Sequence, residues 1–246
     1  MNALVVIPVY NHERAVGGVV DEVLRHDLPV LLVDDGSSKA CAEALTTLVQ
    51  AHSGRVSCLR LEENQGKGGA VMAGLREAAR LGYSHAVQID ADGQHDLGDL
   101  PAFVAAAGHS PDALVTGYPV YDASVPKARL YGRLLTHIWV WINTLSFAVK
   151  DSMCGFRVYP LAPVLDIIDH ARLGRRMDFD PEIAVRLVWR GVPVVNLPTK
   201  VSYPRDGVSH FDALWDNVRI SGMHARLFFG MLLRSPLLLW RKVVRR

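Results

Sequence analysis

Residues 84–95 have the sequence SHAVQIDADGQH, in which an apolar run ends at two carboxylates. The run is typical of a buried strand, so Asp90 and Asp92 are expected where that strand ends. Carboxylate and amide oxygens at this spacing are the kind of ligand that holds Mg²⁺ or Mn²⁺ against phosphate oxygens. The alternative is a polar loop that caps a helix beginning near Leu97, because aspartate is a common helix cap. Taken alone, the stretch leaves both interpretations open.

Strand-like and helix-like segments alternate on both sides of this stretch, from residue 3 to residue 116. β-branched apolar runs predict strands, and apolar residues at helical spacing predict helices. The expected strands are 3–9, 29–33, 55–61, 84–87 and 113–116, and the expected helices are 12–26, 38–50, 69–81 and 100–107. This alternation is typical of an α/β, Rossmann-like fold, with a mostly parallel sheet and helices on both faces.

Four polar clusters follow four consecutive expected strands. They are Tyr10-Asn11, Asp34-Asp35, residues 64–69 and Asp90-Ala91-Asp92. In an open α/β sheet, ligands bind beyond the carboxyl ends of the strands. Polar residues at four such ends therefore favour a binding site along this edge of the sheet over turn chemistry alone.

The glycine-rich turn at 66–69 contains one lysine, Lys67. Backbone N–H groups at a helix N-terminus can approach an anion, and Lys67 adds a positive charge there. The turn lacks the full P-loop pattern, so a flexible turn is the alternative. Asp34 and Asp35 could accept hydrogen bonds from a base or a ribose, or could cap the following helix.

The second half of the chain is less regular. We expect a long apolar helix at 127–149, a strand or loop at 151–159, a helix at 181–190 and a strand at 192–197. Arg157 and Arg205 each lie near a glycine turn, where the planar arginine fork suits a phosphate group or a surface ion pair. Asp178 and Asp180 precede a helix, so they either favour its N-terminus electrostatically or supply a general base.

The composition of the 246 residues is that of a globular protein, with 50% hydrophobic and 21% charged residues. The net charge is +2, but the seven Lys and Arg residues from Asn217 onward have no acidic counterpart. This asymmetry suggests an anionic surface as a partner, and we expect no nucleic acid. Three cysteines without metal-ligand spacing fit a reducing compartment, and no signal peptide is evident. We therefore expect a cytoplasmic protein.

Residues 211–246 are interpreted as a tail that follows a single domain at 1–210. As a helix, the apolar stretch 227–240 would be about 21 Å long, short of the roughly 30 Å core of a bilayer. With basic residues around it, this amphipathic helix is expected to lie peripherally on the inner face of an anionic membrane. The alternative is a helix packed on the body or in a dimer.

Six stretches carry a family resemblance through their residues and their order. They are Ile7–Asn11, Val33–Ser38, Asn64–Ala70, Asp90–His95, Asp151–Arg157 and Tyr203–Ser209. Together they resemble the family-two glycosyltransferases with the GT-A fold. Within that family, the chain is most similar to the dolichol- and polyprenyl-phosphate sugar synthases. Glu13 and Met153 depart from the usual pattern, which leaves the acceptor contacts open.

The resemblance implies a hexosyltransferase that moves a sugar, with inversion, from a nucleoside-diphosphate sugar to a lipid-linked acceptor. The donor would carry UDP or GDP, the favoured acceptor is a polyprenyl phosphate, and the metal is Mg²⁺ or Mn²⁺. Nucleotide binding would involve Pro8, Tyr10, Asn11, Asp34, Asp35, Lys67 and Asp90, and metal binding would involve Asp90, Asp92 and Gln94. Donor or acceptor phosphate would meet Arg157, Arg205 and Ser209, and the expected catalytic residues are Asp92, Asp180 and Arg157.

Several alternatives stay open at this point. A lipid phosphate is already largely ionised near neutral pH, whereas a hydroxyl acceptor on a glycolipid would need a base such as Asp180 or Asp178. A nucleotidyltransferase would place a glycine-rich loop after the first strand, where this chain has Pro8-Val9-Tyr10-Asn11. A non-enzymatic membrane adaptor with the same fold is the third class, and a homo-oligomer is compatible with all of them.

Overall fold

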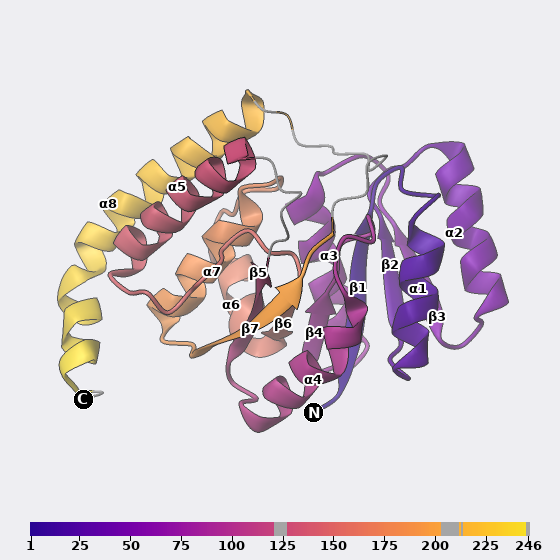
Figure 1. The fold of residues 1–246 in the computed structure, drawn as a ribbon, viewed down its shortest axis with the longest axis horizontal. Helices are drawn as coiled ribbons and strands as arrows, with labels where there is room; N and C mark the ends of the chain where they lie inside the picture. Colours follow the sequence, from indigo (N-terminus) through magenta and orange to yellow (C-terminus); the bar gives the residue numbers. More distant parts are fainter. Residues whose placement is uncertain (121–126, 203–211, 213, 245–246) are drawn as a thin grey trace.

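A computed structural model describes residues 1–120, 127–202, 212 and 214–244 (Figure 1). Over these residues the chain forms a seven-stranded sheet with helices on both faces. The predicted α/β fold with a mostly parallel sheet is confirmed. The stretch Tyr203–Ser209, with the candidate residues Arg205 and Ser209, lies outside the described residues.

The strands follow the order β3-β2-β1-β4-β6-β5-β7 across the sheet. Their bounds are β1 Ala3–Val9, β2 Val30–Asp34, β3 Val56–Arg60, β4 His85–Gln88, β5 Leu114–Val120, β6 Arg157–Pro160 and β7 Val194–Lys200. Strand β6 is antiparallel to both of its neighbours, β4 and β5, and the other pairs are parallel. The sequence predicted a strand or a loop here, and the structure shows a strand inserted between two strands that precede it in the chain.

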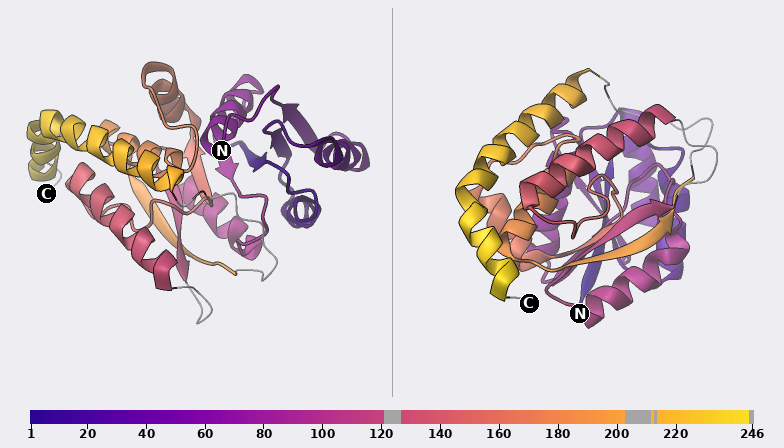
Figure 2. Two further views of the ribbon diagram at one scale, coloured as in Figure 1. Left: turned by 90° about the horizontal axis from the view of Figure 1, so that it is seen from above. Right: turned by 60° about the vertical axis from the view of Figure 1, so that its left-hand side comes forward.

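The helices form two layers against the sheet and a third layer outside them. Their bounds are α1 Val16–Arg25, α2 Lys39–Ala51, α3 Lys67–Arg80, η1 Leu97–Asp99 (a 3₁₀ turn), α4 Leu100–His109, α5 Lys127–Thr144, α6 Leu161–His170, α7 Phe179–Arg190 and α8 Trp215–Val244. The buried side chains of α1, α2 and α4 share one core with the sheet, and those of α3, α6 and α7 share the other. Helices α5 and α8 lie side by side at the far end of the molecule from α2 (Figure 2).

Helix α8 is longer than the 14-residue helix predicted at 227–240, because it begins at Trp215 and ends at Val244, and it contains Pro236. Proline has no N–H to donate to the carbonyl four residues earlier. Here the Ser235 hydroxyl donates to that carbonyl, on Leu232, at 2.9 Å. Replacing the missing donor in this way keeps the helix intact.

The inner face of α8 packs against the body of the protein. Met223, Leu227 and Met231 are almost fully buried. Two basic residues expected to meet lipid instead bind the body: Arg226 pairs with Glu182 at 2.9 Å, and Arg241 donates to the Trp189 carbonyl at 2.6 Å. The alternative of a helix packed on the body is therefore correct for this face.

The opposite face of α8 is apolar and exposed. Leu233, Leu237 and Trp240 are 84%, 48% and 65% exposed. On neighbouring α5, Leu134, Leu135 and Ile138 are exposed as well. No helix in the described ranges combines the length and apolarity that crossing a bilayer requires.

A buried histidine joins α5 to α8. Asn143 Nδ2 lies 3.2 Å from His224 Nδ1, the imidazole stacks near Trp139, and burial lowers the pKa of His224 to about 4. In the unfolded chain the imidazole titrates near 6.5. Between these values the unfolded state binds a proton that the folded state does not, so stability is complete above about pH 6.5 and falls toward pH 4.

We expect the free energy of unfolding to drop by up to about 3 kcal/mol over this window because of His224. In His224→Gln, urea unfolding at pH 5 and pH 7.5 should show a smaller difference than in the wild type. The exposed His109→Gln is the matched control and should keep the wild-type difference. Equal pH dependence in wild type and His224→Gln would contradict the assignment.

Candidate active site

The ends of β1 and β2 are joined by a short network around Asn11. The Asn11 N–H donates to Ser37 Oγ at 3.1 Å, and the Ser38 N–H donates to Asn11 Oδ1 at 2.8 Å. Asn11 has φ of 53°, a left-handed conformation that asparagine tolerates better than most residues. Asn11 therefore connects the turn after β1 to the turn after β2. Pro8 and Tyr10, on either side of the last residue of β1, are half-buried.

The carboxylates of Asp34 and Asp35 are buried and engaged within the protein. Asp35 accepts from the N–H groups of Gln65 and Gly66 at 2.7 and 2.9 Å, and burial raises its pKa. Asp34 pairs with Arg60 at 2.5 Å. Both aspartates thus stabilise neighbouring segments of the chain: Asp35 binds the turn at 65–66, and Asp34 binds Arg60 at the end of β3. Their contact with a nucleoside stays a prediction.

The glycine-rich turn at the start of α3 packs against the loop that precedes α7. The Gly69 N–H donates to the Arg175 carbonyl at 2.9 Å. A Cβ on Gly66 would lie 2.6 Å from that same carbonyl oxygen, and one on Gly68 would lie 2.4 Å from Phe179 Cβ. The turn was predicted to cradle an anion with its N–H groups. The N–H groups of Gln65, Gly66 and Gly69 instead bond within the protein, so anion binding by the turn stays a prediction.

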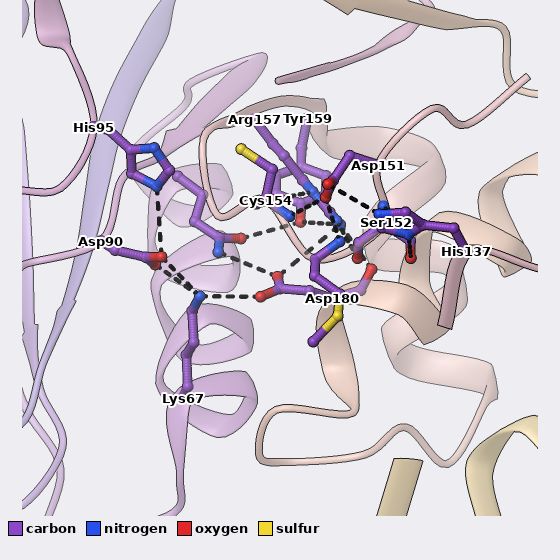
Figure 3. Close-up of polar contacts among 12 residues, drawn as sticks. Lys67, Asp90, His95, His137, Asp151, Ser152, Cys154, Arg157, Tyr159 and Asp180 are labelled. Carbon is purple, nitrogen blue, oxygen red and sulfur yellow. Dashed lines mark hydrogen bonds and ion pairs between the residues drawn. The ribbon is translucent and has the colours of Figure 1, made fainter. Parts of the chain in front are cut away.

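Lys67 bridges two carboxylates that come from different elements (Figure 3). Its Nζ lies 2.8 Å from Asp90 Oδ1, at the end of β4, and 3.0 Å from Asp180 Oδ2, on α7. Burial alone would raise the pKa of Asp90, but the charge of Lys67 and the nearby His95 imidazole, 3.6 Å from Asp90 Oδ2, outweigh it and lower that pKa strongly. The three groups therefore form a charged cluster inside the site.

The Asp180 carboxylate is also bound by a chain of two neutral side chains, Gln88 and Tyr159. Gln88 Nε2 donates to Asp180 Oδ1 at 3.2 Å, and the Tyr159 hydroxyl donates to Gln88 Oε1 at 3.0 Å. Burial raises the pKa of Tyr159 to about 12, so this hydroxyl is a donor at neutral pH. The network fixes the Asp180 carboxylate against Lys67.

Arg157 lies deeper than a phosphate contact requires. Its side chain has no exposed surface, and its guanidinium donates to the carbonyls of Cys154, Ser152 and Asp180 at 2.7 to 2.8 Å. In this arrangement Arg157 joins the loop before β6 to the start of α7. Its predicted role at phosphate has no support from this geometry.

An open cavity lies beside the Asp90 cluster. Asp90, Asp92, Gln94, His95, Arg133 and Gly155 are among its lining residues. Asp92 accepts from the Gln94 N–H at 3.0 Å, and burial together with the charge of Asp90 raises its pKa. The predicted metal residues Asp90, Asp92 and Gln94 therefore share one cavity.

The donor groups of this cavity suit a hard divalent cation. His95 Nδ1 is buried and makes no hydrogen bond within the part of the chain that the structure describes, and Asp90 Oδ1 is engaged there by the ammonium of Lys67, at 2.8 Å. Among the described residues, however, no three His, Cys, Asp or Glu side chains are placed to hold a metal ion together. The protein thus offers part of a coordination shell, which a ligand would have to complete.

Arg133 was not among the predicted site residues. It reaches the cavity from α5, and its guanidinium forms a bidentate pair with Asp151 at 2.6 and 2.8 Å. Asp151 also pairs with His137 at 3.0 Å and accepts from the N–H groups of Met153 and Cys154. An arginine inside an apolar helical pattern was the available signal, but only the folded chain shows that it lines the same cavity as Asp92.

Gly155 follows this turn and packs directly on Asp90. A Cβ built on Gly155 would lie 2.2 Å from Asp90 Oδ2. Glycine is therefore required where the loop before β6 meets the carboxylate at the end of β4.

The comparison with protein families decides the identity of the chain. The sequence profile of glycosyl transferase family 2 matches residues 4–180. The chain belongs to this family. This family 2 glycosyltransferase is 29% identical to polyprenol monophosphomannose synthase from Mycolicibacterium smegmatis. The match covers 84% of this chain and 79% of that protein. It is also 25% identical to UDP-N-acetylglucosamine–dolichyl-phosphate N-acetylglucosaminyltransferase from Methanococcus voltae, over 80% and 84% of the two chains.

A solved structure shows the same fold. Glucosyl-3-phosphoglycerate synthase from Mycobacterium tuberculosis, in complex with Mn²⁺ and UDP-glucose, matches with a TM-score of 0.65 at 15% identity. The match covers 94% of this family 2 glycosyltransferase and 78% of that chain. The GT-A fold that the sequence predicted is confirmed.

Proposed function

We propose that this glycosyltransferase moves a sugar, with inversion, from a nucleoside-diphosphate sugar to a polyprenyl phosphate at the cytoplasmic face of a membrane. The observation that carries the proposal is that Asp90, Asp92 and Arg133 line the same cavity. Acidic groups suit a cation bound to a diphosphate, and an arginine suits a second anion. The relatives named for polyprenol and dolichyl phosphate support an anionic lipid as that second ligand.

The donor would lie along the strand edge, with its nucleoside toward Pro8, Tyr10, Asn11 and Asp35. Its diphosphate would meet Lys67, which is the ammonium nearest to Asp90. Asp90, Asp92 and Gln94 would hold Mg²⁺ or Mn²⁺, as the Mn²⁺ and UDP-glucose of the structural neighbour suggest. Such an ion neutralises charge on a departing nucleoside diphosphate.

The acceptor phosphate would enter beside Arg133, whose charge attracts it and whose position is fixed by Asp151. An ionised phosphate oxygen can attack the anomeric carbon without a strong base, since the second pKa of a phosphomonoester is about 6. The Asp180 carboxylate is already engaged by Lys67 at 3.0 Å and by the Gln88 amide at 3.2 Å. This placement favours a lipid phosphate over a hydroxyl acceptor.

Asp180→Asn tests this choice of acceptor. With a UDP- or GDP-sugar and polyprenyl phosphate, we expect the variant to keep turnover within about tenfold of the wild type, because a general base would be worth about 10²- to 10⁴-fold. The assay is sugar transfer to lipid, run beside a polyprenol that offers only a hydroxyl. A loss of 100-fold or more on lipid phosphate, or transfer to polyprenol alone, would contradict the proposal.

The exposed apolar faces of α5 and α8 would lie on the membrane that carries the acceptor. On α8, Leu233, Leu237, Trp240 and Val244 fall on one face of the helix and are all exposed. Such a face enters the interfacial region of a bilayer without spanning it. The three cysteines of the chain are free, which suits the cytoplasmic face.

Placing acids on this face should weaken membrane binding. We expect Leu233→Glu/Trp240→Glu to lower partitioning onto vesicles of anionic phospholipid by about tenfold or more, because two exposed apolar groups that would enter the bilayer become charged ones. Vesicle sedimentation measures the effect, and unchanged thermal melting shows that the fold is kept. Leu81→Glu changes an exposed leucine at the end of α3 and should bind like the wild type. Equal binding of all three proteins would contradict the assigned face.

A further inference from the structure

Lys67 occupies an unusual place for a lysine. It is the first residue of α3, where the positive end of the helix dipole disfavours a cation. Its side chain is only 19% exposed, and the described ion pairs of its ammonium are with Asp90 and Asp180. Carboxylates, and not the helix, therefore hold it there.

The ammonium lies where Asp90 would need to receive a metal ion. Both Asp90 oxygens are within about 3 Å of Nζ, at 2.8 and 3.0 Å. The backbone of Gly155 packs on the other side of this carboxylate, so Asp90 has little room to turn away. A divalent cation on Asp90 and an ammonium at this distance would repel each other strongly at the low dielectric of a buried site.

We infer that Lys67 is a built-in counter-ion that keeps Asp90 from binding a divalent cation until the nucleotide sugar arrives. The inference rests on the proposed function, since it concerns the metal and the donor of that reaction. The four-carbon stem of lysine is flexible, so an arriving diphosphate can draw the ammonium away from Asp90 while the stem stays in place. Asp90 is then released to the metal. Asp180, held by Gln88 and Tyr159, does not move with the lysine.

Two consequences distinguish this arrangement from a plain metal site. The wild type should bind Mn²⁺ weakly on its own and far better with a nucleoside diphosphate. By linkage, Mn²⁺ should improve nucleotide affinity by the same factor. Removing the ammonium should raise affinity for Mn²⁺ alone and should reduce this mutual enhancement.

The experiment measures Mn²⁺ binding without nucleotide, by the electron paramagnetic resonance signal of free Mn²⁺. We expect Lys67→Met to bind Mn²⁺ about 5- to 150-fold more tightly than the wild type, which is the usual size of coupling between two sites. Lys67→Arg keeps the charge and should stay weak. Lys67→Met/Asp90→Asn should lose the gain, which shows that the metal is at Asp90.

Lys67→Met leaves two buried carboxylates without their cation, so this variant alone could fail to fold. Lys67→Met/Asp180→Asn removes one charge of each sign and should show the same gain in Mn²⁺ affinity. In both variants, Mn²⁺ should raise the melting temperature more than it does in the wild type.

Calorimetry of UDP and GDP, with and without Mn²⁺, separates the two levels of the proposal. If Mn²⁺ strengthens nucleotide binding to the wild type but both lysine variants bind Mn²⁺ alone as weakly as the wild type, the role of Lys67 is overturned and the proposed reaction stands. If Mn²⁺ does not affect nucleotide binding to the wild type, metal dependence itself fails, and the inference fails with it.

Discussion

Asp92→Asn should lower kcat/KM for sugar transfer by about 100- to 1000-fold, the cost of losing one charged group that supports a developing negative charge. Asp92 lines the cavity, and the hydrogen bond described for its side chain is a single one, from the Gln94 N–H. It therefore contributes little to the fold. The variant should melt within a few degrees of the wild type while its activity in the Mn²⁺-supplemented assay collapses.

Asp96→Asn is the matched control for this result. Asp96 is exposed, lies four positions along the same loop and accepts from the Gly98 N–H to cap η1. Its replacement should leave activity near that of the wild type. If Asp92→Asn kept more than a tenth of wild-type kcat/KM, Asp92 would not belong to the reacting centre.

Gly155→Ala should be nearly as damaging, although it adds only one methyl group. The added Cβ would lie 2.2 Å from Asp90 Oδ2, and the carboxylate is held by Lys67 on another side. Either Asp90 or the loop before β6 must shift, and a displacement of about 1 Å in an active site can cost about 100-fold in rate. Overpacking should also cost about 1–3 kcal/mol of stability. Initial rates and urea unfolding measure the two effects.

Gly108→Ala provides the comparison for an equal change elsewhere. Gly108 is an exposed position in α4, and a Cβ there would meet nothing within 4 Å. This variant should be at least as stable as the wild type, because alanine is a better helix former than glycine and Gly108 lies in the last turn of α4. Its activity should not change. Full activity in Gly155→Ala would show that Asp90 can move without loss, against the geometry described above.

The first half of the fold could be predicted because its signals are local. Each strand from β1 to β4 is a short apolar run, and each is followed by polar residues that the parallel arrangement brings to one edge. Helix α6 was missed, and β6 was left between strand and loop. Its antiparallel place between β4 and β5 depends on pairings such as Gln88 with Arg157, which are far apart in the chain.

The candidate site shows the same division. Asp90, Asp92 and Gln94 were proposed as metal residues from the family resemblance, since their spacing alone left a helix cap open, and they do share a cavity. The partners of Lys67, the burial of Arg157 and the approach of Arg133 were not predictable, because each depends on how α3, α5 and α7 meet in space. The domain boundary at residue 210 stays a prediction, as do the roles of Arg205 and Ser209.

The position of β6 also sets an order of events during synthesis. Strand β5 is made before β6, yet it cannot pair with β4, since β6 must occupy the place between them. A nascent chain that has emerged only as far as β5 lacks Gly155, which packs on Asp90 in the folded protein. The cavity beside Asp90 also needs Val201, and Lys67 needs Asp180 as a partner, so the site depends on residues made long after the Asp90 stretch that starts it.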